Sequence, residues 1–181
     1  MEKLLKIPYT VFNNNWDLLQ QFLERRGNPR YELVGDVDFY RRKDIFDLGN
    51  LMRVYGDLNL FDTSIESLGN LEYVGGYLDL EGTPIQSLGN IIRVDCYLDL
   101  RYTPIKSLGN IEYVGGNLTL YDTPIQSLGN LEYVGGYLDL RKTPIQSLGN
   151  LNYAGDRIIL LSNHQIPPEQ LTKFKGQIEY L

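Results

Sequence analysis

Aliphatic and polar residues recur along most of this chain with a spacing of 20. In residues 71–90, which read LEYVGGYLDLEGTPIQSLGN, aliphatic residues stand at positions 71, 74, 78, 80, 85 and 88. Residues 131–150 repeat this order and differ at only two positions. A fixed period of this length predicts a solenoid, in which each unit buries its apolar side against its neighbours. The chain is therefore expected to form one elongated stack of coils.

Each repeat contains one short strand with a buried face. Leu78 and Leu80 alternate with Tyr77 and Asp79, which is the period-2 pattern of such a strand. Strands that recur once per 20 residues in one direction must pair in parallel. The connection is too short for a crossover helix, so we expect turns, 3₁₀ pieces or a second narrow strand.

Two further features of the repeat are expected to shape or hydrogen-bond the backbone. The pair Gly75-Gly76 precedes the strand, and we expect it to form a tight bend with positive φ. A threonine follows each strand, and its hydroxyl is expected to bond the backbone of the next coil. The members of this column are Thr63, Thr83, Thr103, Thr123 and Thr143.

The pattern xLxLxxTPIxSLGNLxxVGG resembles the short, 20-residue kind of leucine-rich repeat, and the resemblance covers residues 33–166. The phrase LEYVGGYLDL also resembles the coils of receptor L domains. The resemblance implies a mainly β protein, a right-handed parallel β-solenoid of leucine-rich-repeat type. Repeats with this wording look like those of bacterial and phage accessory proteins. The family shares no common active site, so the resemblance implies partner binding without naming the partner.

The ends of an open stack need covering segments. Residues 1–30 are expected to form an N-terminal cap with a helix at about 15–26, for which Asn14 or Asn15 is the N-cap. Residues 31–166 form the solenoid, with six repeats and a final partial coil. Residues 167–181 form a C-terminal cap, in which a short helix runs from Pro167-Pro168 to about Lys175 and QIEYL follows as a tail or an edge strand.

Composition narrows the class of protein. The formal charge of −6 disfavours a nucleic-acid partner, which would require a basic face. Cys96 is the single cysteine and can form no internal disulfide, which fits a reducing compartment. No stretch reads as a secretory signal or a membrane span. We expect a cytoplasmic protein without a membrane partner.

Catalytic signals are sparse. His164 is the one histidine, and it belongs to no Ser/His/Asp or Cys/His pattern. No Cys/His set suits zinc, and no Gly-rich loop opens a long helix to hold phosphate. We therefore expect no enzyme activity, no cofactor and no metal site.

Positions just after the strand change in every coil, whereas outward strand positions vary less, and both sets are rich in Tyr, Asp and Arg. In a solenoid these columns stand side by side on the strand-bearing face, with the Tyr and Asp rows facing outward. Tyrosine and arginine are enriched in binding hot spots. Asp79 and Asp99 would be neighbours in the ladder, a mild repulsion that suggests use against a basic partner. We expect a protein partner to bind Tyr77, Asp79, Tyr97, Asp99, Arg101, Tyr102, Tyr121, Tyr137, Asp139 and Arg141.

Other interpretations stay open. A second column, Tyr73, Tyr113, Tyr133 and Tyr153 with Arg53 and Arg93, is expected to serve packing on the opposite face. A basic cluster near the N-terminal cap has no assigned role; it comprises Arg25, Arg26, Arg30, Arg41, Arg42 and Lys43. The chain could instead be structural, forming homo-oligomers through its caps or the QIEYL edge. It could also bind a carbohydrate or small ligand on the tyrosine row.

Overall fold

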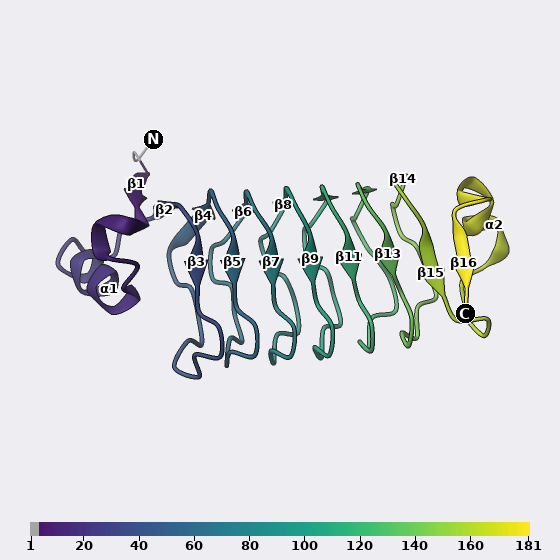
Figure 1. Cartoon of the computed structure of the whole chain (residues 1–181), viewed down its shortest axis with the longest axis horizontal. Helices are drawn as coiled ribbons and strands as arrows, with labels where there is room; N and C mark the ends of the chain where they lie inside the picture. The colour runs from purple at the N-terminus through teal and green to yellow at the C-terminus, as the bar shows by residue number, and fades with distance from the viewer. Residues whose placement is uncertain (1–3) are drawn as a thin grey trace.

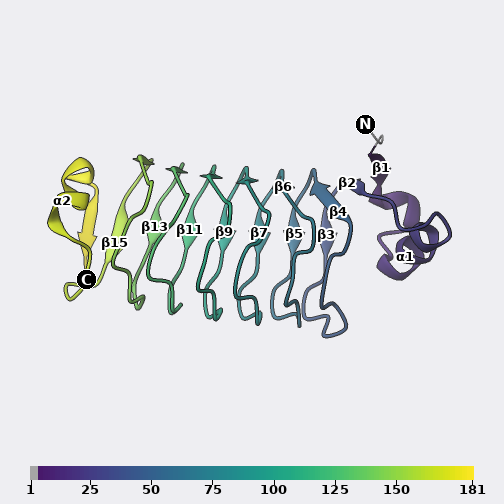
Figure 2. The same ribbon diagram turned by 180° about the vertical axis from the view of Figure 1, so that it is seen from behind.

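The computed structural model describes residues 4–181, and they form a long row of stacked coils (Figure 1). The chain winds along the row in sequence order, so its two ends lie at opposite ends of the molecule. A view from behind shows the same order, with α1 (Trp16–Glu24) at one end and α2 (Pro168–Leu171) at the other (Figure 2). The fold is a mainly β, parallel solenoid with about 20 residues per turn.

Two eight-stranded sheets run along the row, and every pairing in them is parallel. Sheet A contains β1 (Leu5–Pro8), β2 (Tyr31–Val34), β4 (Leu51–Val54), β6 (Tyr73–Val74), β8 (Arg93–Val94), β10 (Tyr113–Val114), β12 (Tyr133–Val134) and β14 (Tyr153–Ala154). Sheet B contains β3 (Val37–Asp38), β5 (Leu58–Asn59), β7 (Leu78–Asp79), β9 (Leu98–Asp99), β11 (Leu118–Thr119), β13 (Leu138–Asp139), β15 (Ile158–Leu160) and β16 (Ile178–Tyr180). The strands of sheet B are those predicted from the leucine alternation. The strands of sheet A lie in the connections, for which a second narrow strand was one of the expected forms.

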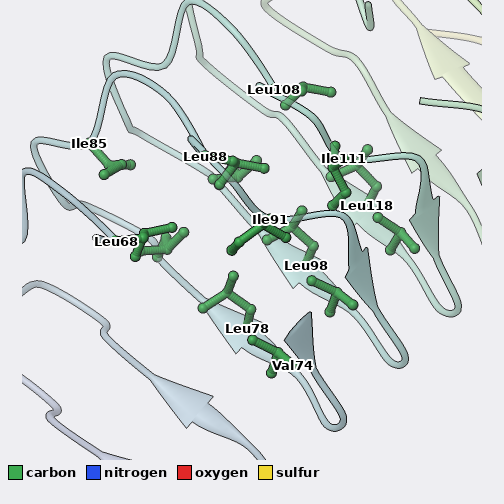
Figure 3. Packing of buried hydrophobic residues seen from close by; sticks show 14 of the residues in the cluster. Leu68, Val74, Leu78, Ile85, Leu88, Ile91, Leu98, Leu108, Ile111 and Leu118 are labelled. Carbon is green, nitrogen blue, oxygen red and sulfur yellow. The ribbon is translucent and has the colours of Figure 1, made fainter. Parts of the chain in front are cut away.

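The repeat fixes the register, and the register builds the core. Leu78 pairs with Leu98, and Leu98 with Leu118, so each aliphatic position lies beside its counterpart one repeat away. The side chains of Leu78, Ile85 and Leu118 are fully buried, in rows that cross from coil to coil (Figure 3). Full burial of such a side chain contributes roughly 1.5–3 kcal/mol.

Both ends of the chain carry helices close to the expected places. The Asn15 side chain accepts a hydrogen bond from the Leu18 backbone N at 3.1 Å, so Asn15 is the N-cap of α1. The helix ends at Glu24, two residues before the expected end, because the chain turns through Gly27 at φ 76°. At the other end, α2 stops at Leu171 and the 3₁₀ turn η2 (Thr172–Phe174) replaces its expected last turn.

Two N-terminal elements were not predicted from the sequence. Strand β1 pairs with β2 in sheet A, and the 3₁₀ helix η1 (Tyr9–Phe12) connects β1 to the segment before α1. Neither element belongs to the repeat, so the period could not reveal it. QIEYL, by contrast, contributes the edge strand β16, as one of its two expected forms.

The expectation of positive φ at Gly75-Gly76 was wrong. Neither glycine has left-handed backbone, whereas the glycine of each Leu-Gly-Asn does, as at Gly89 with φ 60°. Gly76 is instead required by close approach, since a Cβ there would lie 2.8 Å from the Gly56 carbonyl carbon of the preceding coil. The glycine pairs therefore let successive coils stack closely.

The threonine column is structural, but it bonds within its own coil, so the expected bond to the next coil was wrong. The Thr83 hydroxyl donates to the Leu80 carbonyl at 2.7 Å, and Thr123 donates to Leu120 at 2.8 Å. The bond spans three residues because the chain turns sharply after the strand. No helix within residues 4–181 is long and apolar enough to cross a bilayer.

Candidate binding surface on sheet B

The aspartates of sheet B close the turn that follows each strand. Oδ1 of Asp79, Asp99 and Asp139 accepts a hydrogen bond from the backbone N two residues later, at 3.0, 3.0 and 3.1 Å. This turn occupies one side of each carboxylate. The expectation that the whole column faces solvent was wrong, since Asp99 is 8% and Asp139 3% exposed.

Arginines cover the two buried carboxylates. Arg101 Nε lies 3.0 and 2.9 Å from the two Asp99 oxygens, and its Nη2 bonds Glu81 Oε2 at 2.5 Å. Arg141 makes a bidentate pair with Asp139, at 2.9 and 2.6 Å. The hydrogen bond to Asp99 is the main cause of the raised pKa of Arg101, and the bond to Asp139 has the same effect on Arg141. Both guanidiniums are thus held in fixed orientations.

A shallow hollow of about 410 Å³ lies between these two arginines, over β11. Seven of the ten residues expected to bind a partner line it. They are Asp99, Arg101, Tyr102, Tyr121, Tyr137, Asp139 and Arg141, joined by Thr119.

Thr119 is not among the residues expected to bind a partner, although its coil differs in sequence from both neighbouring coils. The coils on either side read Leu-Asp-Leu-Arg at residues 98–101 and 138–141, whereas residues 118–121 read Leu-Thr-Leu-Tyr. The smaller threonine and the uncharged tyrosine interrupt the Asp–Arg ladder, and this interruption coincides with the hollow.

The other three expected residues lie on the same sheet, nearer the N-terminus. The rings of Tyr77 and Tyr97 stack at 4.8 Å with an interplanar angle of 4°. Burial, followed by the charges of Tyr77 and Asp79, raises the pKa of Tyr97 to about 12. Burial is also the main reason that the pKa of Asp79 is raised. Sheet B therefore presents a stacked tyrosine pair and a hollow along one face.

Within residues 4–181, three acidic side chains have carboxylate oxygens close enough to share a metal ion. They are Asp79, Glu81 and Asp99, with one oxygen of each within 4.8 Å of the others. The Arg101 guanidinium already bonds Glu81 and Asp99. The positive charge among these carboxylates is therefore supplied by the protein itself.

The tyrosines of sheet A form a second column. Tyr133 stacks between Tyr113 and Tyr153, at 4.6 Å on each side, and the Arg93 guanidinium carbon lies 3.8 Å from the Tyr113 ring centroid. The Tyr73 hydroxyl donates to Asp95 at 2.5 Å. Equivalent positions in successive coils thus pack ring on ring, in the arrangement expected of a packing column.

Several of the N-terminal basic residues contact acidic or aromatic side chains nearby. Arg42 lies 3.5 Å from Asp17 of α1, and Lys43 lies 2.7 Å from Asp62. Arg26 stacks on Phe22 instead, with its guanidinium carbon 3.7 Å from the ring centroid. These contacts give three of the cations a local structural partner.

His164 lies in the C-terminal turn. Its Nδ1 accepts a hydrogen bond from the Ile166 backbone N at 3.2 Å, and its ring stacks on Tyr180 at 5.7 Å. The side chain shapes this turn.

The chain matches no protein-family model, and the comparisons with curated proteins and with solved structures also find no match.

Proposed function

We propose that the protein is a non-enzymatic interaction module that binds a protein partner on the exposed side of sheet B. The hollow beside Arg101 and Arg141 is the observation that carries this proposal, because it gathers seven of the residues selected from the sequence. Its arginines are held by hydrogen bonds before any partner arrives. A surface already ordered loses little entropy on binding. No cofactor or metal takes part.

The proposal includes a right-handed solenoid of leucine-rich-repeat type whose two end segments act as caps. Trp16 of α1 packs edge-on against Phe39 of the first coil, with centroids 4.9 Å apart. At the other end, the Gln177 side chain donates to the Ala154 carbonyl at 2.7 Å. Both contacts tie an end segment to the terminal coil. The protein would work in the cytoplasm as a bacterial or phage accessory protein, as an adaptor or an inhibitor of its partner.

The test removes tyrosines and keeps the arginines. Replacing Arg101 would leave Asp99 without its counter-ion and would disturb the fold. The variant Tyr97→Ser/Tyr121→Ser/Tyr137→Ser shortens three side chains of sheet B, and Tyr153→Ser on sheet A is the matched control.

Partners are captured from cell extract, identified by mass spectrometry and titrated as purified proteins. We expect the triple variant to bind at least about tenfold more weakly, a loss typical of hot-spot tyrosines, and the control to bind normally. Equal binding by the triple variant, with an unchanged melting temperature, would contradict the proposal.

A second candidate is self-assembly, and β16 favours it. This strand pairs with β15 on one side only and ends sheet B, so its other edge can accept another strand. Light scattering over a concentration series tests this. A mass that rises with concentration in the native chain, and not in Ile178→Pro, supports assembly through β16.

A further inference from the structure

The accessible charges around the hollow are cationic. The side chains of Arg101 and Arg141 are 40% and 35% exposed, whereas those of Asp99 and Asp139 are 12% and 4% exposed. The Arg141–Asp139 pair is formally neutral, and Arg101 with Asp99 and Glu81 carries one net negative charge, but in both groups the guanidinium is more exposed than the carboxylates. An incoming group therefore meets the positive member of each pair first.

Both arginines also have an N–H group that is available to donate a further hydrogen bond. Arg101 and Arg141 both bond their acidic partners through Nε and Nη2. Among residues 4–181, neither Nη1 has a hydrogen-bond partner. Because a guanidinium offers five N–H donors, each arginine can bond a further acceptor without releasing its aspartate.

Thr119 contributes a hydroxyl to the lining of the hollow. It is 9% exposed and lines the hollow, and within the described chain its hydroxyl has no hydrogen-bond partner. Its Cα partners in the ladder are Asp99 and Asp139, whose carboxylates bond the turn and an arginine. Within the described residues no fully buried side-chain oxygen or nitrogen lacks a partner, so the Thr119 hydroxyl is within reach of solvent. This hydroxyl is free to bond a group that enters the hollow.

We propose that the hollow binds the carboxylate of a glutamate or aspartate side chain on an acidic segment of the protein partner. This inference rests on the proposed function and names the chemistry of its partner. Thr119 lies between Asp99 and Asp139 in the ladder, and Arg101 and Arg141 lie two coils apart on either side, roughly 9.6 Å along the ladder. Phenol groups of Tyr102, Tyr121 and Tyr137 line the same space and offer further donors.

An acidic peptide fits this surface better than a nucleic acid does. The chain carries a formal charge of −6, and Asp57 and Asp79 belong to the same face as the hollow. A continuous run of phosphates along the sheet would meet these carboxylates. A peptide can place one carboxylate in the hollow and other residue types beside the aspartates.

The repeat itself provides a variant that fills the hollow. Thr119→Asp/Tyr121→Arg converts residues 118–121 into the Leu-Asp-Leu-Arg of both neighbouring coils, so the fold already accommodates it. The new carboxylate and guanidinium would occupy the space and pair with each other. Thr119→Ser keeps the hydroxyl and serves as the matched control.

The probe is a blocked pentapeptide, acetyl-Gly-Gly-Glu-Gly-Gly-amide, which carries one carboxylate; the same peptide with Gln or Lys in place of Glu, and inorganic phosphate, are parallel arms at one ionic strength. NMR follows the Thr119 amide and the Nε–Hε signals of Arg101 and Arg141. We expect the Glu peptide to shift all three signals in the native chain and in Thr119→Ser. We expect Thr119→Asp/Tyr121→Arg to bind at least tenfold more weakly with its melting temperature retained.

Three results would overturn the inference. They are no shift with the Glu peptide, equal binding by the filled variant, and phosphate or the Lys peptide shifting the same signals as strongly as the Glu peptide. The proposed function is tested separately, by partner capture with the tyrosine variant. A partner that still binds the filled variant, and fails to bind the tyrosine variant, would exclude the carboxylate site and leave the binding face in place.

Discussion

Six equivalent residues, one after each strand of sheet B from β3 to β13, have left-handed backbone. Their φ angles range from 50° to 70°, and Gly82 is the one glycine; the others are Arg41, Asp62, Tyr102, Asp122 and Lys142. For a residue with a Cβ this conformation costs about 1–2 kcal/mol. The same positions vary most between repeats, so the chain keeps large side chains beside sheet B at some cost in stability.

This backbone strain predicts that adding a Cβ and removing one at equivalent positions have opposite effects on the free energy of unfolding. Gly82→Ala should lower the free energy of unfolding by about 1 kcal/mol, because a Cβ at Gly82 meets no atom within 4 Å and only the backbone angle opposes it. Tyr102→Gly should raise it by roughly 0.5 kcal/mol, since glycine also loses more entropy on folding. Urea unfolding measures both changes. Destabilisation by Tyr102→Gly would show that the ring contributes more than the backbone strain removes.

Asp79 predicts a pH-dependent effect. Its pKa is raised, mainly by burial, so the ionised form is disfavoured in the folded state. The penalty is absent below the unfolded pKa of about 3.9 and fully present above the folded pKa. Asp79→Asn should therefore stabilise the protein at pH 7 by roughly 0.5 kcal/mol, the scale of a like-charge cross-strand pair.

The gain from Asp79→Asn should disappear as the pH falls below about 3.9. Asn59 shows that the turn survives, since its Oδ1 accepts from the Phe61 backbone N at 3.0 Å in the equivalent place. Urea unfolding at several pH values checks this. A gain that is independent of pH would show that ionisation of Asp79 is not the cause.

At the scale of residues, the sequence predicts which residue types stand on sheet B better than it predicts how deeply each side chain is buried. Alternation placed Asp99 and Asp139 on the outer side of the strand, but burial by Arg101 and Arg141 depends on side chains folding back over two residues. Thr119 could be recognised only by comparing its coil with both neighbours. Its free hydroxyl follows from contacts, which no pattern of residue types contains.

At the scale of elements, the turn after each strand of sheet B depends on the threonine hydroxyl. Thr123→Val removes the donor to the Leu120 carbonyl in a buried turn and should lower the free energy of unfolding by about 1–2 kcal/mol. Thr143→Val removes the same bond where Thr143 is partly exposed, and water can replace the hydroxyl, so a smaller loss is expected. Denaturant midpoints compare the two. Equal losses would argue that water access does not matter here.

Besides the two end helices, the elements that the sequence predicted are those repeated every 20 residues. Sheet B and the aliphatic rows follow from the period, because each coil meets the same neighbour environment. For the connection the sequence left three forms open, and a second narrow strand was one of them. Strand β1 has no counterpart in the repeat, and Pro8 at its end is a poor strand former. Its pairing with β2 depends on segments more than 20 residues apart, which local patterns do not report.

At the scale of the molecule, each coil is stabilised by its two neighbours, so the place of a mutation matters. Leu118→Ala lies in a central coil and should cost about 2–5 kcal/mol, as expected for a fully buried leucine. Leu171→Ala lies in α2, next to the last coil, and should loosen that end.

Amide hydrogen exchange distinguishes the two variants. Leu118→Ala should speed exchange in the coils on both sides of residue 118, and Leu171→Ala should do so mainly after about residue 150. Uniform faster exchange in Leu171→Ala would indicate that the whole stack unfolds as a single cooperative unit.

The constant register between coils has a consequence for how such a chain can change over generations. Segments 71–90 and 131–150 are nearly identical, so unequal recombination between their coding sequences would add or delete whole coils. A gained or lost coil would keep every backbone pairing, yet it would move the stacked tyrosines relative to the hollow by about 4.8 Å. Selectivity for a partner could thus be retuned in discrete steps without redesign of the core.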